Sequence, residues 1–523
     1  MELIEQEALR LTVRSDYVPY ITNYLEKSEV LKDNGKTADI VVHWGIKEMQ
    51  HIAKFYSELK LPSPILKEYN WPGLFTPFDH QKTTSAFLSL RDRAFCFNEA
   101  GTGKTSSVIW AADYLMTKGL VKRVLVVCPL SIMYSAWQAD IFKTAMHRTV
   151  AVAYGDVNKR RKILNGSYEF VIINYDGVGI VSDVICKLGF DLIVIDEANA
   201  YKTVTTKRWK TLAKLLMPST KLWMLTGTPA SQSPLDAYGL ARLVAPGNVP
   251  KYFTAWRDKV MHQITRFKYV SRPHAKQEVF NALQPAIRFT KAECLDLPPV
   301  TYQTREVALT PQVKKYYSAI KNQMLVEAAG EQISAVNAAA KLTKLLQISG
   351  GAVYTDTHEV VEFDVSPRLN ALTEVLDETE HKVIIFVPYR HTIELVAKYL
   401  NEQGVSNEII NGQVAAKERG NIINRFQTNE FPRVLIIQPQ AASHGVTLTA
   451  ADTVVFWSPV MSVETYLQCV ARIDRVGQVN KMTIVHLQGS EIERKMYQML
   501  QSKIDSHEKL VDLYKEELGI KDE

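Results

Sequence analysis

A glycine-rich turn that ends in a lysine and a threonine is the feature of this chain with the clearest chemical meaning. Residues 98–105 read Asn-Glu-Ala-Gly-Thr-Gly-Lys-Thr, after an apolar run and before a helical pattern. Between a strand and a helix, the backbone N–H groups of such a turn face a polyphosphate. Lys104 is then placed to reach the β- and γ-phosphates, and the Thr105 hydroxyl is placed to hold Mg²⁺. Asn98 stands where the strict pattern has glycine, so an ordinary glycine turn before a helix is the alternative interpretation.

Two adjacent carboxylates follow a second apolar run. Asp196 and Glu197 come directly after residues 192–195, Leu-Ile-Val-Ile, which are typical of a buried parallel strand. Ligands of open α/β sheets bind at the carboxyl ends of the strands. Asp196 is therefore expected to hold Mg²⁺, directly or through water, and Glu197 to orient or deprotonate the attacking water. The alternative is a solvated acidic turn.

A pair of arginines in the second half of the chain has the spacing of a phosphate sensor. If the segment is helical, Gln468, Arg472 and Arg475 fall at i, i+4 and i+7 and share one helix face. Arginines aimed at the γ-phosphate would act as arginine fingers, which stabilise the charge that develops during hydrolysis. Arginine suits a bidentate phosphate contact better than lysine does. A basic surface helix capped by Gly477 is the alternative.

The elements that must position these residues form two sets of apolar strand patterns with helical patterns between them. This alternation predicts an α/β fold with two parallel-sheet lobes in tandem, helical insertions between them and a C-terminal helical segment. The predicted parts are a small N-terminal appendage of unknown role (1–70), lobe 1 (71–247), a helical insertion and inter-lobe linker (248–365), lobe 2 (366–490) and amphipathic C-terminal helices (491–523). The predicted strands are 94–98, 123–128, 149–153, 169–174, 192–195 and 222–225 in lobe 1, and 383–387, 407–410, 434–437, 454–457 and 483–487 in lobe 2.

Composition narrows the class of protein. The 523 residues favour two to four domains, and a net charge of +6 permits nucleic-acid binding without demanding it. Five scattered cysteines indicate reduced thiols, and no His/Cys spacing is typical of zinc. No signal pattern or membrane-length apolar run is visible, so no membrane partner is expected. We expect a cytoplasmic protein in a bacterium or phage-infected cell, or a nuclear one in a eukaryote.

These segments, in this order, resemble superfamily-two helicases, and closely resemble the Swi/Snf (Snf-two) type of double-stranded DNA translocase in a short bacterial or phage-style form. The resemblance runs from Phe78 to the end of the chain and implies two RecA-like lobes. It implies that Gln81 reads adenine, and it places these residues at the nucleotide: Gln81, Gly101, Thr102, Gly103, Lys104, Thr105, Asp196 and Gly445. It places these residues at nucleic acid: Pro129, Ser131, Asn174, Tyr175, Thr226, Thr228 and Thr447.

Three departures from the family pattern stand out. Asn199 replaces the histidine of Asp-Glu-Ala-His, and Phe289 replaces the second arginine of an Arg-Arg-Thr-Lys segment. The motif at 442–445 reads Ala-Ser-His-Gly instead of Gly-Gly-Leu-Gly, with Thr447 in place of an asparagine. The residues expected to hydrolyse ATP are all present: Lys104, Asp196, Glu197, Gln468, Arg472 and Arg475.

The resulting prediction is a nucleic-acid-dependent ATPase. It would use ATP and Mg²⁺ to translocate on double-stranded DNA, through contacts to the phosphate backbone, and to remodel DNA or protein–DNA complexes. One alternative is a helicase that unwinds DNA or RNA. Another is a nucleotide-dependent adaptor, or the motor subunit of a multi-protein DNA-processing system, with a protein partner bound through residues 1–70.

Overall fold

The computed structural model describes residues 2–5, 7–55, 61–227, 229–230, 233–264, 269–328, 335–354, 360–442 and 446–502. Two predicted site residues, Thr228 and Gly445, lie outside the described residues, as do 443–444 of the same motif and 503–523 of the predicted C-terminal helices. The chain divides into two compact units: Met1–Ala230 with Pro234–Cys294, and the remainder from Leu295 onward.

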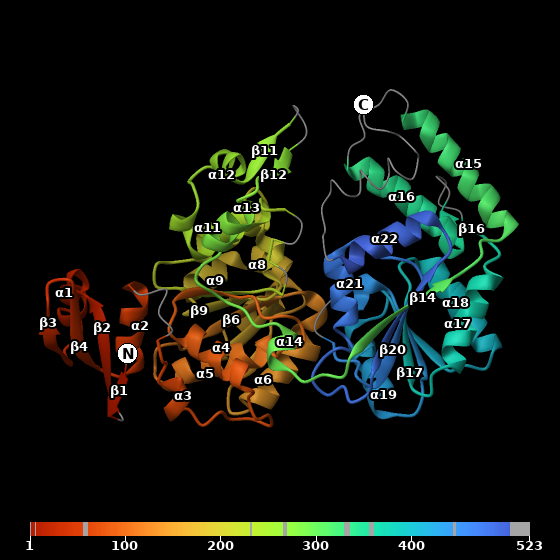
Figure 1. The fold of residues 1–523 in the computed structure, drawn as a ribbon. Helices are drawn as coiled ribbons and strands as arrows, with labels where there is room; N and C mark the ends of the chain where they lie inside the picture. The colour runs from red at the N-terminus through yellow and green to blue at the C-terminus, as the bar shows by residue number, and fades with distance from the viewer. Residues whose placement is uncertain are drawn as a thin grey trace. The chain divides into compact units, whose positions relative to one another are not determined.

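The first unit begins with a small antiparallel sheet, drawn in red in Figure 1. Its strand order is β1-β2-β4-β3. Alternate residues of β2 (Leu9, Leu11 and Val13) are buried, as the two-residue period of a half-buried strand requires. They belong to a hydrophobic core that also includes residues of lobe 1. The elements are β1 (Glu2–Glu5), β2 (Ala8–Arg14), α1 (Val18–Thr22), β3 (Ser28–Asp33), β4 (Thr37–His43) and α2 (Ile46–Phe55).

Lobe 1 is built on a parallel sheet that has seven strands among the described residues. The order is β13-β5-β10-β9-β6-β8-β7, and each neighbouring pair is parallel. All seven carboxyl ends therefore lie at one edge. The strands are β5 (Arg93–Cys96), β6 (Val124–Cys128), β7 (Val150–Val152), β8 (Phe170–Asn174), β9 (Leu192–Ile195), β10 (Lys221–Leu225) and β13 (Ala286–Ile287).

Helices cover both faces of this sheet, so its central strands are apolar on both sides (Figure 1). In β6, Val124, Val126 and Cys128 join one core, whereas Leu125 and Val127 join the other. The first core takes α4 (Asp79–Ser89), α5 (Lys104–Thr117) and α6 (Ala139–Thr144). The second takes α7 (Val157–Leu164), α8 (Tyr175–Ile180), α9 (Ser182–Leu188), α10 (Lys207–Leu215), α11 (Asp236–Val244), α12 (Phe253–Val260) and α13 (Ala275–Ala282).

The segment predicted to join the lobes, 248–365, is shared between the two units. Residues up to Cys294 group with lobe 1 and carry the hairpin β11 (Met261–Gln263) and β12 (Tyr269–Ser271), then β13. Residues from Leu295 group with lobe 2. They include α15 (Pro311–Ala328), α16 (Ala335–Gly350) and the hairpin β15 (Ala352–Tyr354) and β16 (Val360–Glu362).

Lobe 2 is a second parallel sheet, of order β14-β21-β20-β17-β19-β18 among the described residues. Its first edge strand lies within the predicted linker, and none of the residues of this strand is buried, so it lacks the apolar run of a buried strand. The strands are β14 (Val300–Glu306), β17 (Lys382–Phe386), β18 (Asn407–Ile410), β19 (Val434–Ile437), β20 (Ala451–Phe456) and β21 (Met482–Gln488). The helices are α17 (Ser366–Asp377), α18 (Arg390–Glu402), α19 (Ala416–Thr428), α20 (Pro439–Ala442), α21 (Val463–Val470) and α22 (Glu491–Gln501).

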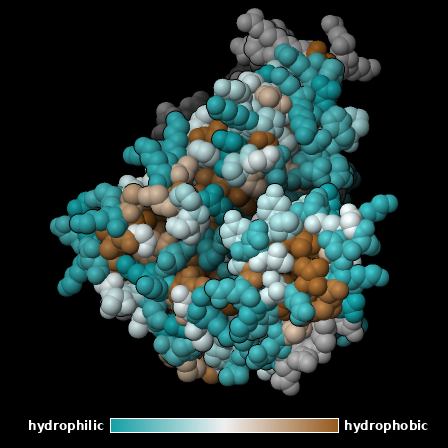
Figure 2. Space-filling view, turned by 90° about the vertical axis from the view of Figure 1, so that its left-hand side faces the viewer, coloured by the Kyte–Doolittle hydropathy of each residue, from teal (hydrophilic) through white to brown (hydrophobic). Residues whose placement is uncertain are grey.

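The two parallel-sheet lobes confirm the predicted fold class. Helix α22 starts at Glu491, as predicted, and buries Ile492, Met496 and Leu500 along one face. Within the described part of the chain, none of the helices combines the length and the apolar character needed to cross a bilayer. The face drawn in Figure 2 is largely hydrophilic, and its hydrophobic residues form separate patches.

Candidate functional site

The glycine-rich turn lies between β5 and α5, as predicted. Gly101 and Gly103 have φ values of 89° and 77°, in the left-handed region that glycine adopts without strain. The Lys104 ammonium group donates hydrogen bonds to the carbonyl oxygens of Asn98 (2.7 Å) and Glu99 (3.0 Å). Helix α5 starts at Lys104, so its first N–H groups and the positive end of its dipole point at the turn. This geometry is suited to holding a polyphosphate.

Asn98, the departure from the strict pattern, is completely buried. Its Nδ2 donates to the hydroxyl of Thr84 in α4 (2.8 Å), and its Oδ1 accepts from the backbone N–H of Phe289 (3.0 Å). Glu99 adds two hydrogen bonds to the segment that contains Phe289. Its N–H donates to the Phe289 carbonyl (2.9 Å), and its carboxylate accepts from the Lys291 N–H (3.1 Å). The side chain that replaces glycine thus fastens the turn to two segments distant in sequence.

Gln81 stands in the first turn of α4 and faces the same loop. Its Oε1 accepts from the Phe78 N–H (3.0 Å), and its Nε2 donates to the Thr102 carbonyl (3.2 Å), which the His80 ring also contacts (2.8 Å). A Cβ added at Gly103 would lie 2.0 Å from Gln81 Nε2 and would displace this amide, and the φ of 77° at Gly103 favours glycine in its own right. The structure therefore brings Gln81 and the phosphate-binding turn together, as expected.

The carboxylate pair lies at the end of β9. Asp196 accepts hydrogen bonds from the indole of Trp137 (2.8 Å, to Oδ2) and from the Glu197 N–H (2.9 Å, to Oδ1). Desolvation raises the pKa of Asp196, against the hydrogen bond from Trp137 and the charge of Lys104, which lower it. Glu197 has a φ of 48°, a left-handed conformation that is costly for a residue with a Cβ. The strained backbone thus lies directly after Asp196, at the residue expected to act on the attacking water.

The contact between Trp137 and Asp196 was not predicted from the sequence. The indole is fully buried, and 59 residues of chain separate it from the carboxylate it contacts. No local pattern signals such a pair. The only available hint was an N–H donor in an apolar stretch that must find a partner when buried.

The other predicted residues of lobe 1 lie along the same sheet edge. Thr226 is buried, with its N–H bonded to the Cys96 carbonyl (3.1 Å), and Gly227 backs onto the turn, where an added Cβ would lie 3.4 Å from the Ala100 nitrogen. Pro129 and Ser131 follow β6, and Asn174 and Tyr175 join β8 to α8.

Asn174 and Tyr175 also make internal hydrogen bonds. The Asn174 Oδ1 accepts from Arg160 (3.0 Å), and the Tyr175 hydroxyl donates to the backbone carbonyl of Asp196 (2.6 Å). Burial and the charge of Asp196 raise the pKa of Tyr175, so this hydroxyl remains a donor. Tyr175 thereby links the predicted nucleic-acid edge to the backbone of Asp196, the carboxylate predicted to hold Mg²⁺.

In lobe 2 the predicted single helix face for Gln468, Arg472 and Arg475 is wrong. Helix α21 ends at Val470, and both arginines lie in the turns that follow. They converge by another route, because each donates from Nη1 to the carbonyl oxygen of Val446, both at 3.0 Å. Arg472 also donates to the Gln468 carbonyl (2.7 Å). The turns that follow α21, and not helical spacing, bring the two guanidinium groups together.

The two arginines differ in exposure. Arg472 is 4% exposed, and its backbone carbonyl accepts from the Leu448 N–H (3.0 Å), whereas Arg475 is half-buried. Thr447, between buried Val446 and Leu448, is exposed. Arg472 thus stabilises the segment that presents Thr447, and Arg475 is the more accessible of the two.

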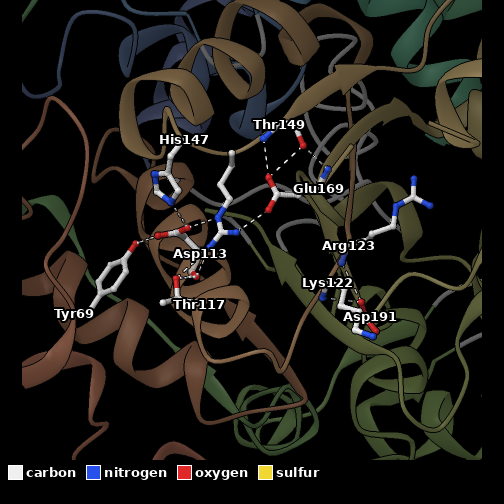
Figure 3. Close-up of polar contacts among 10 residues, drawn as sticks. Tyr69, Asp113, Thr117, Lys122, Arg123, His147, Thr149, Glu169 and Asp191 are labelled. Atoms are coloured by element: carbon white, nitrogen blue, oxygen red, sulfur yellow. Dashed lines mark hydrogen bonds and ion pairs between the residues drawn. The ribbon is translucent and has the colours of Figure 1, made fainter. Parts of the chain in front are cut away.

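The far half of α5 is held by a buried polar network (Figure 3). Asp113, 1% exposed, accepts hydrogen bonds from the Tyr69 hydroxyl, His147 (2.8 Å) and Arg148 Nε (2.5 Å). Arg148 continues to Glu169 (2.7 Å), which also accepts from the Thr149 N–H. The helix that begins at the phosphate-binding turn is therefore anchored at its other end to the chain before α4 and to the starts of β7 and β8.

Comparison with known proteins decides the family. The family model of the SNF2-related domain matches residues 80–350, more than half of the chain. This chain belongs to the SNF2-related family. A second match, to the helicase conserved C-terminal domain, covers residues 367–477 of this SNF2-related chain. Both matches confirm the resemblance inferred from the motifs.

Relatives of the SNF2-related chain include a mouse protein and a phage protein. Chromodomain-helicase-DNA-binding protein 1-like of Mus musculus is 25% identical over 427 residues, which are 78% of this chain and 46% of that protein. Putative protein p41 of Acyrthosiphon pisum secondary endosymbiont phage 1 is 24% identical over 436 residues, which are 79% of this chain and 92% of p41. The chain thus spans about half the length of the mouse relative.

Among solved structures, the Sulfolobus solfataricus SWI2/SNF2 ATPase core in complex with dsDNA aligns with a TM-score of 0.42 and 22% identity. The alignment covers 83% of this chain and 92% of that chain.

The residues of the site fit ATP with Mg²⁺. Left-handed glycines and the start of α5 form an anion-binding turn, and Lys104 supplies a cation beside it. The Thr105 hydroxyl and the Asp196 carboxylate are oxygen ligands of the kind that Mg²⁺ prefers. The desolvation that raises the pKa of Asp196 would be offset by a bound divalent cation.

Proposed function

We propose that this SNF2-related chain is a DNA-dependent ATPase that translocates on double-stranded DNA and remodels DNA or protein–DNA complexes. The observation that carries the proposal is the arrangement at the carboxyl edge of the lobe 1 sheet. Adjacent strands β5, β10 and β9 present the phosphate-binding turn, Thr226, and the Asp196–Glu197 pair. The next strands, β6 and β8, present the predicted nucleic-acid residues. One edge of the sheet would therefore carry both the residues proposed for hydrolysis and those proposed for the DNA track.

In lobe 1, Lys104 would leave its carbonyl partners in the turn and neutralise charge on the β- and γ-phosphates. Glu197, held in its left-handed conformation, would orient and deprotonate the attacking water. Mg²⁺, when held by Thr105 and Asp196, would neutralise charge on the phosphate oxygens. Gln81 would contact adenine from its place beside Thr102.

Arg472 and Arg475 of lobe 2 would approach the γ-phosphate when the lobes close on ATP. Such contacts would exist only in the closed state, so ATP would favour closure through its higher affinity for that state, and hydrolysis would let the lobes reopen. We assign the direct phosphate contact mainly to Arg475, because Arg472 is buried against the Val446 and Gln468 carbonyls.

The DNA track would consist mostly of phosphate contacts, since a motor that reads sequence would stall at preferred sites. The proposed contacts are those of Pro129, Ser131, Asn174, Tyr175, Thr226, Thr228 and Thr447. The Tyr175 hydroxyl, which donates to the Asp196 carbonyl, offers a direct connection between this track and the metal-binding carboxylate.

The test is ATP hydrolysis measured with no nucleic acid, duplex DNA, single-stranded DNA and RNA. Lys104→Ala, which removes the phosphate-binding ammonium, is the inactive control. Displacement of a third strand from a triplex then reports movement along duplex DNA. Stimulation by duplex DNA together with triplex displacement would support the proposal. Stimulation by single strands or RNA alone would instead identify an unwinding helicase, and no hydrolysis in any condition would identify a nucleotide-dependent adaptor.

A protein partner for residues 1–70 would find an open sheet edge. Strand β3 pairs only with β4 among the described residues, and its Val30 and Leu31 are 40% and 50% exposed. Edge strands of this kind can accept a strand from another protein. Leu31→Lys should abolish co-purification of such a partner while leaving the ATPase unchanged. Co-purification that persists in this variant would speak against this use of the edge.

We place the site of action in the cytoplasm of a bacterial or phage-infected cell, in keeping with the phage relative, of which the alignment covers 92%.

A further inference from the structure

Helix α10 of lobe 1 carries an uninterrupted basic face that none of the predicted motifs uses. Lys207, Lys210 and Lys214, spaced i, i+3 and i+7, are all exposed. The opposite side is anchored, because Leu212 is buried and the Trp209 indole donates to the Gly239 carbonyl (2.8 Å). The orientation of the three lysines is therefore fixed by the packing of the helix.

Within the described ranges, no carboxylate is paired with this face. The sequence contains no Asp or Glu from Ala198 to Leu235. Other basic residues of this stretch are paired, Lys202 with Asp236 (3.2 Å) and Arg208 with Asp176 (3.0 Å). Among the residues that the structure describes, no carboxylate forms an ion pair with the three lysines of the face.

The arrangement is unfavourable for the helix itself. Lys207 is the first residue of α10 and Lys210 completes its first turn, where the positive end of the helix dipole repels cations. Like charges three or four residues apart repel each other as well. A sequence shaped by stability alone would place acidic residues here, and the first turn has none. A polyanion bound to this face would remove both penalties.

Helix α10 itself packs beside α8, the helix that begins at Tyr175 of the predicted DNA track. The Arg208 guanidinium lies 4.8 Å from the ring centroid of Tyr175 and bonds to Asp176 in α8. Arg208 makes this contact from another side of α10, and the exposed lysines extend along about 10 Å of the helix axis, at about 1.5 Å per residue. Three nucleotides of one DNA strand span a similar length, at about 3.4 Å each.

We propose that Lys207, Lys210 and Lys214 form a phosphate-binding surface that extends the DNA track of lobe 1 beyond Tyr175. The inference rests on the proposed function, because it takes duplex DNA as the occupant. The surface holds the phosphate backbone without reading sequence, and it contributes to DNA affinity rather than to the chemistry of hydrolysis.

The test compares the full chain with a variant in which Lys207, Lys210 and Lys214 are all changed to Gln. The matched control changes Lys27, Lys32 and Lys36, which are exposed lysines of the N-terminal sheet, to Gln and so removes the same charge. Binding of a duplex of about 40 base pairs is followed by fluorescence anisotropy over a range of salt concentrations. Each lost phosphate contact should reduce the slope of log affinity against log salt by about 0.9.

For the α10 variant, we expect the slope of log affinity against log salt to be smaller by two to three contacts' worth, at roughly 0.9 for each contact. We also expect this variant to bind duplex at least about tenfold more weakly near physiological salt. ATPase without DNA and turnover at saturating DNA should be unchanged, with a higher DNA concentration needed for half-stimulation. Slopes and affinities equal to those of wild type, or an equal loss in the control, would overturn the inference. Selective loss of RNA or acidic-peptide binding, with duplex binding intact, would also overturn it.

A charge-reversal variant separates this role from a folding defect. Lys207→Glu places an acidic residue at the start of α10, so the melting temperature should hold or rise while duplex affinity falls. A fall in both would indicate a structural role and overturn the inference. If wild type itself shows neither duplex binding nor duplex-stimulated ATPase, the proposed function fails as well, which distinguishes that failure from one confined to α10.

Discussion

At the scale of single residues, the structure shows how one substitution in a motif can be accommodated. Asn98 occupies a position where the strict pattern has glycine, yet its amide meets a donor and an acceptor of matching chemistry, the Phe289 N–H and the Thr84 hydroxyl. A buried amide with both groups satisfied stabilises its surroundings, whereas an unsatisfied one would cost about 1–3 kcal/mol. The turn therefore gains an anchor to the segment around Phe289.

The two arginines of lobe 2 should respond differently to removal. Arg472→Ala removes the Arg472 hydrogen bonds to the Gln468 and Val446 carbonyls, of which only the Val446 carbonyl keeps the bond from Arg475, and it empties buried space. We therefore expect a loss of about 2 kcal/mol or more in unfolding free energy, together with lost activity. Arg475→Ala should leave stability within about 1 kcal/mol but reduce DNA-stimulated turnover on the order of a thousandfold, with ATP binding retained. Thermal unfolding, nucleotide binding and ATPase rates measure the three quantities. Equal loss of ATP binding and turnover in Arg475→Ala would argue against the finger role.

At the scale of elements, helix α5 joins the nucleotide site to the polar network of Figure 3. Asp113→Asn should destabilise lobe 1 by about 3 kcal/mol, because Arg148 then loses a buried charge partner. Asp183→Asn is the control, since its ion pair with Arg161 is exposed and should contribute less than about 1 kcal/mol. Unfolding of each variant in urea, followed by tryptophan fluorescence, provides the comparison. Similar midpoints for the two variants would contradict the importance of the network.

Strand β21 gives lobe 2 a pH-dependent stability. His486 is fully buried between the Tyr466 hydroxyl (2.9 Å) and the stacked ring of Tyr497, and burial lowers its pKa to about 4. The native state therefore keeps the ring neutral, whereas the unfolded state binds a proton below about pH 6.5. The stabilisation is complete above about pH 6.5 and is lost as the pH falls towards 4, by up to about 3 kcal/mol.

Urea unfolding of lobe 2 between pH 7 and pH 4 measures this effect, and Trp457 is a suitable probe because it is buried in that lobe. His486→Gln removes the titrating ring, so the unfolding free energy of the variant should fall less than that of wild type between about pH 6.5 and pH 4. An unchanged profile in the variant would assign the acid sensitivity to other groups.

At the scale of the whole molecule, the proposed track makes DNA affinity depend strongly on salt and little on sequence. For roughly five or six phosphate contacts, the affinity for duplex DNA should fall by about three orders of magnitude between about 50 and about 200 mM salt. Duplexes of unrelated sequence should bind within about threefold of one another, since phosphate contacts carry no sequence information. Anisotropy titrations measure both. An affinity that stays flat as salt rises would count against a phosphate-based grip.

The sequence by itself determined the features that depend on neighbouring residues. The strand, glycine turn and helix of 94–117, the apolar strand before Asp196, and the alternation of strands and helices in two lobes all follow from local dihedral preferences and periodicity. Strands such as Leu192–Ile195, Asn407–Ile410 and Val434–Ile437 lie where the pattern predicted them. Because these patterns depend only on neighbouring residues, the amino-acid sequence is enough to predict them.

Only the tertiary structure decided which distant groups meet. Trp137 reaches Asp196 across 59 residues and Asn98 reaches Phe289 across 191, and edge strand β14 joins lobe 2 from within a segment that the sequence assigned to a linker. Arg472 and Arg475 converge on one carbonyl through turns, not through the helix that their spacing suggested. These contacts depend on how the sheets are ordered and on which buried polar groups need partners, and neither is encoded in the spacing of residues along the chain.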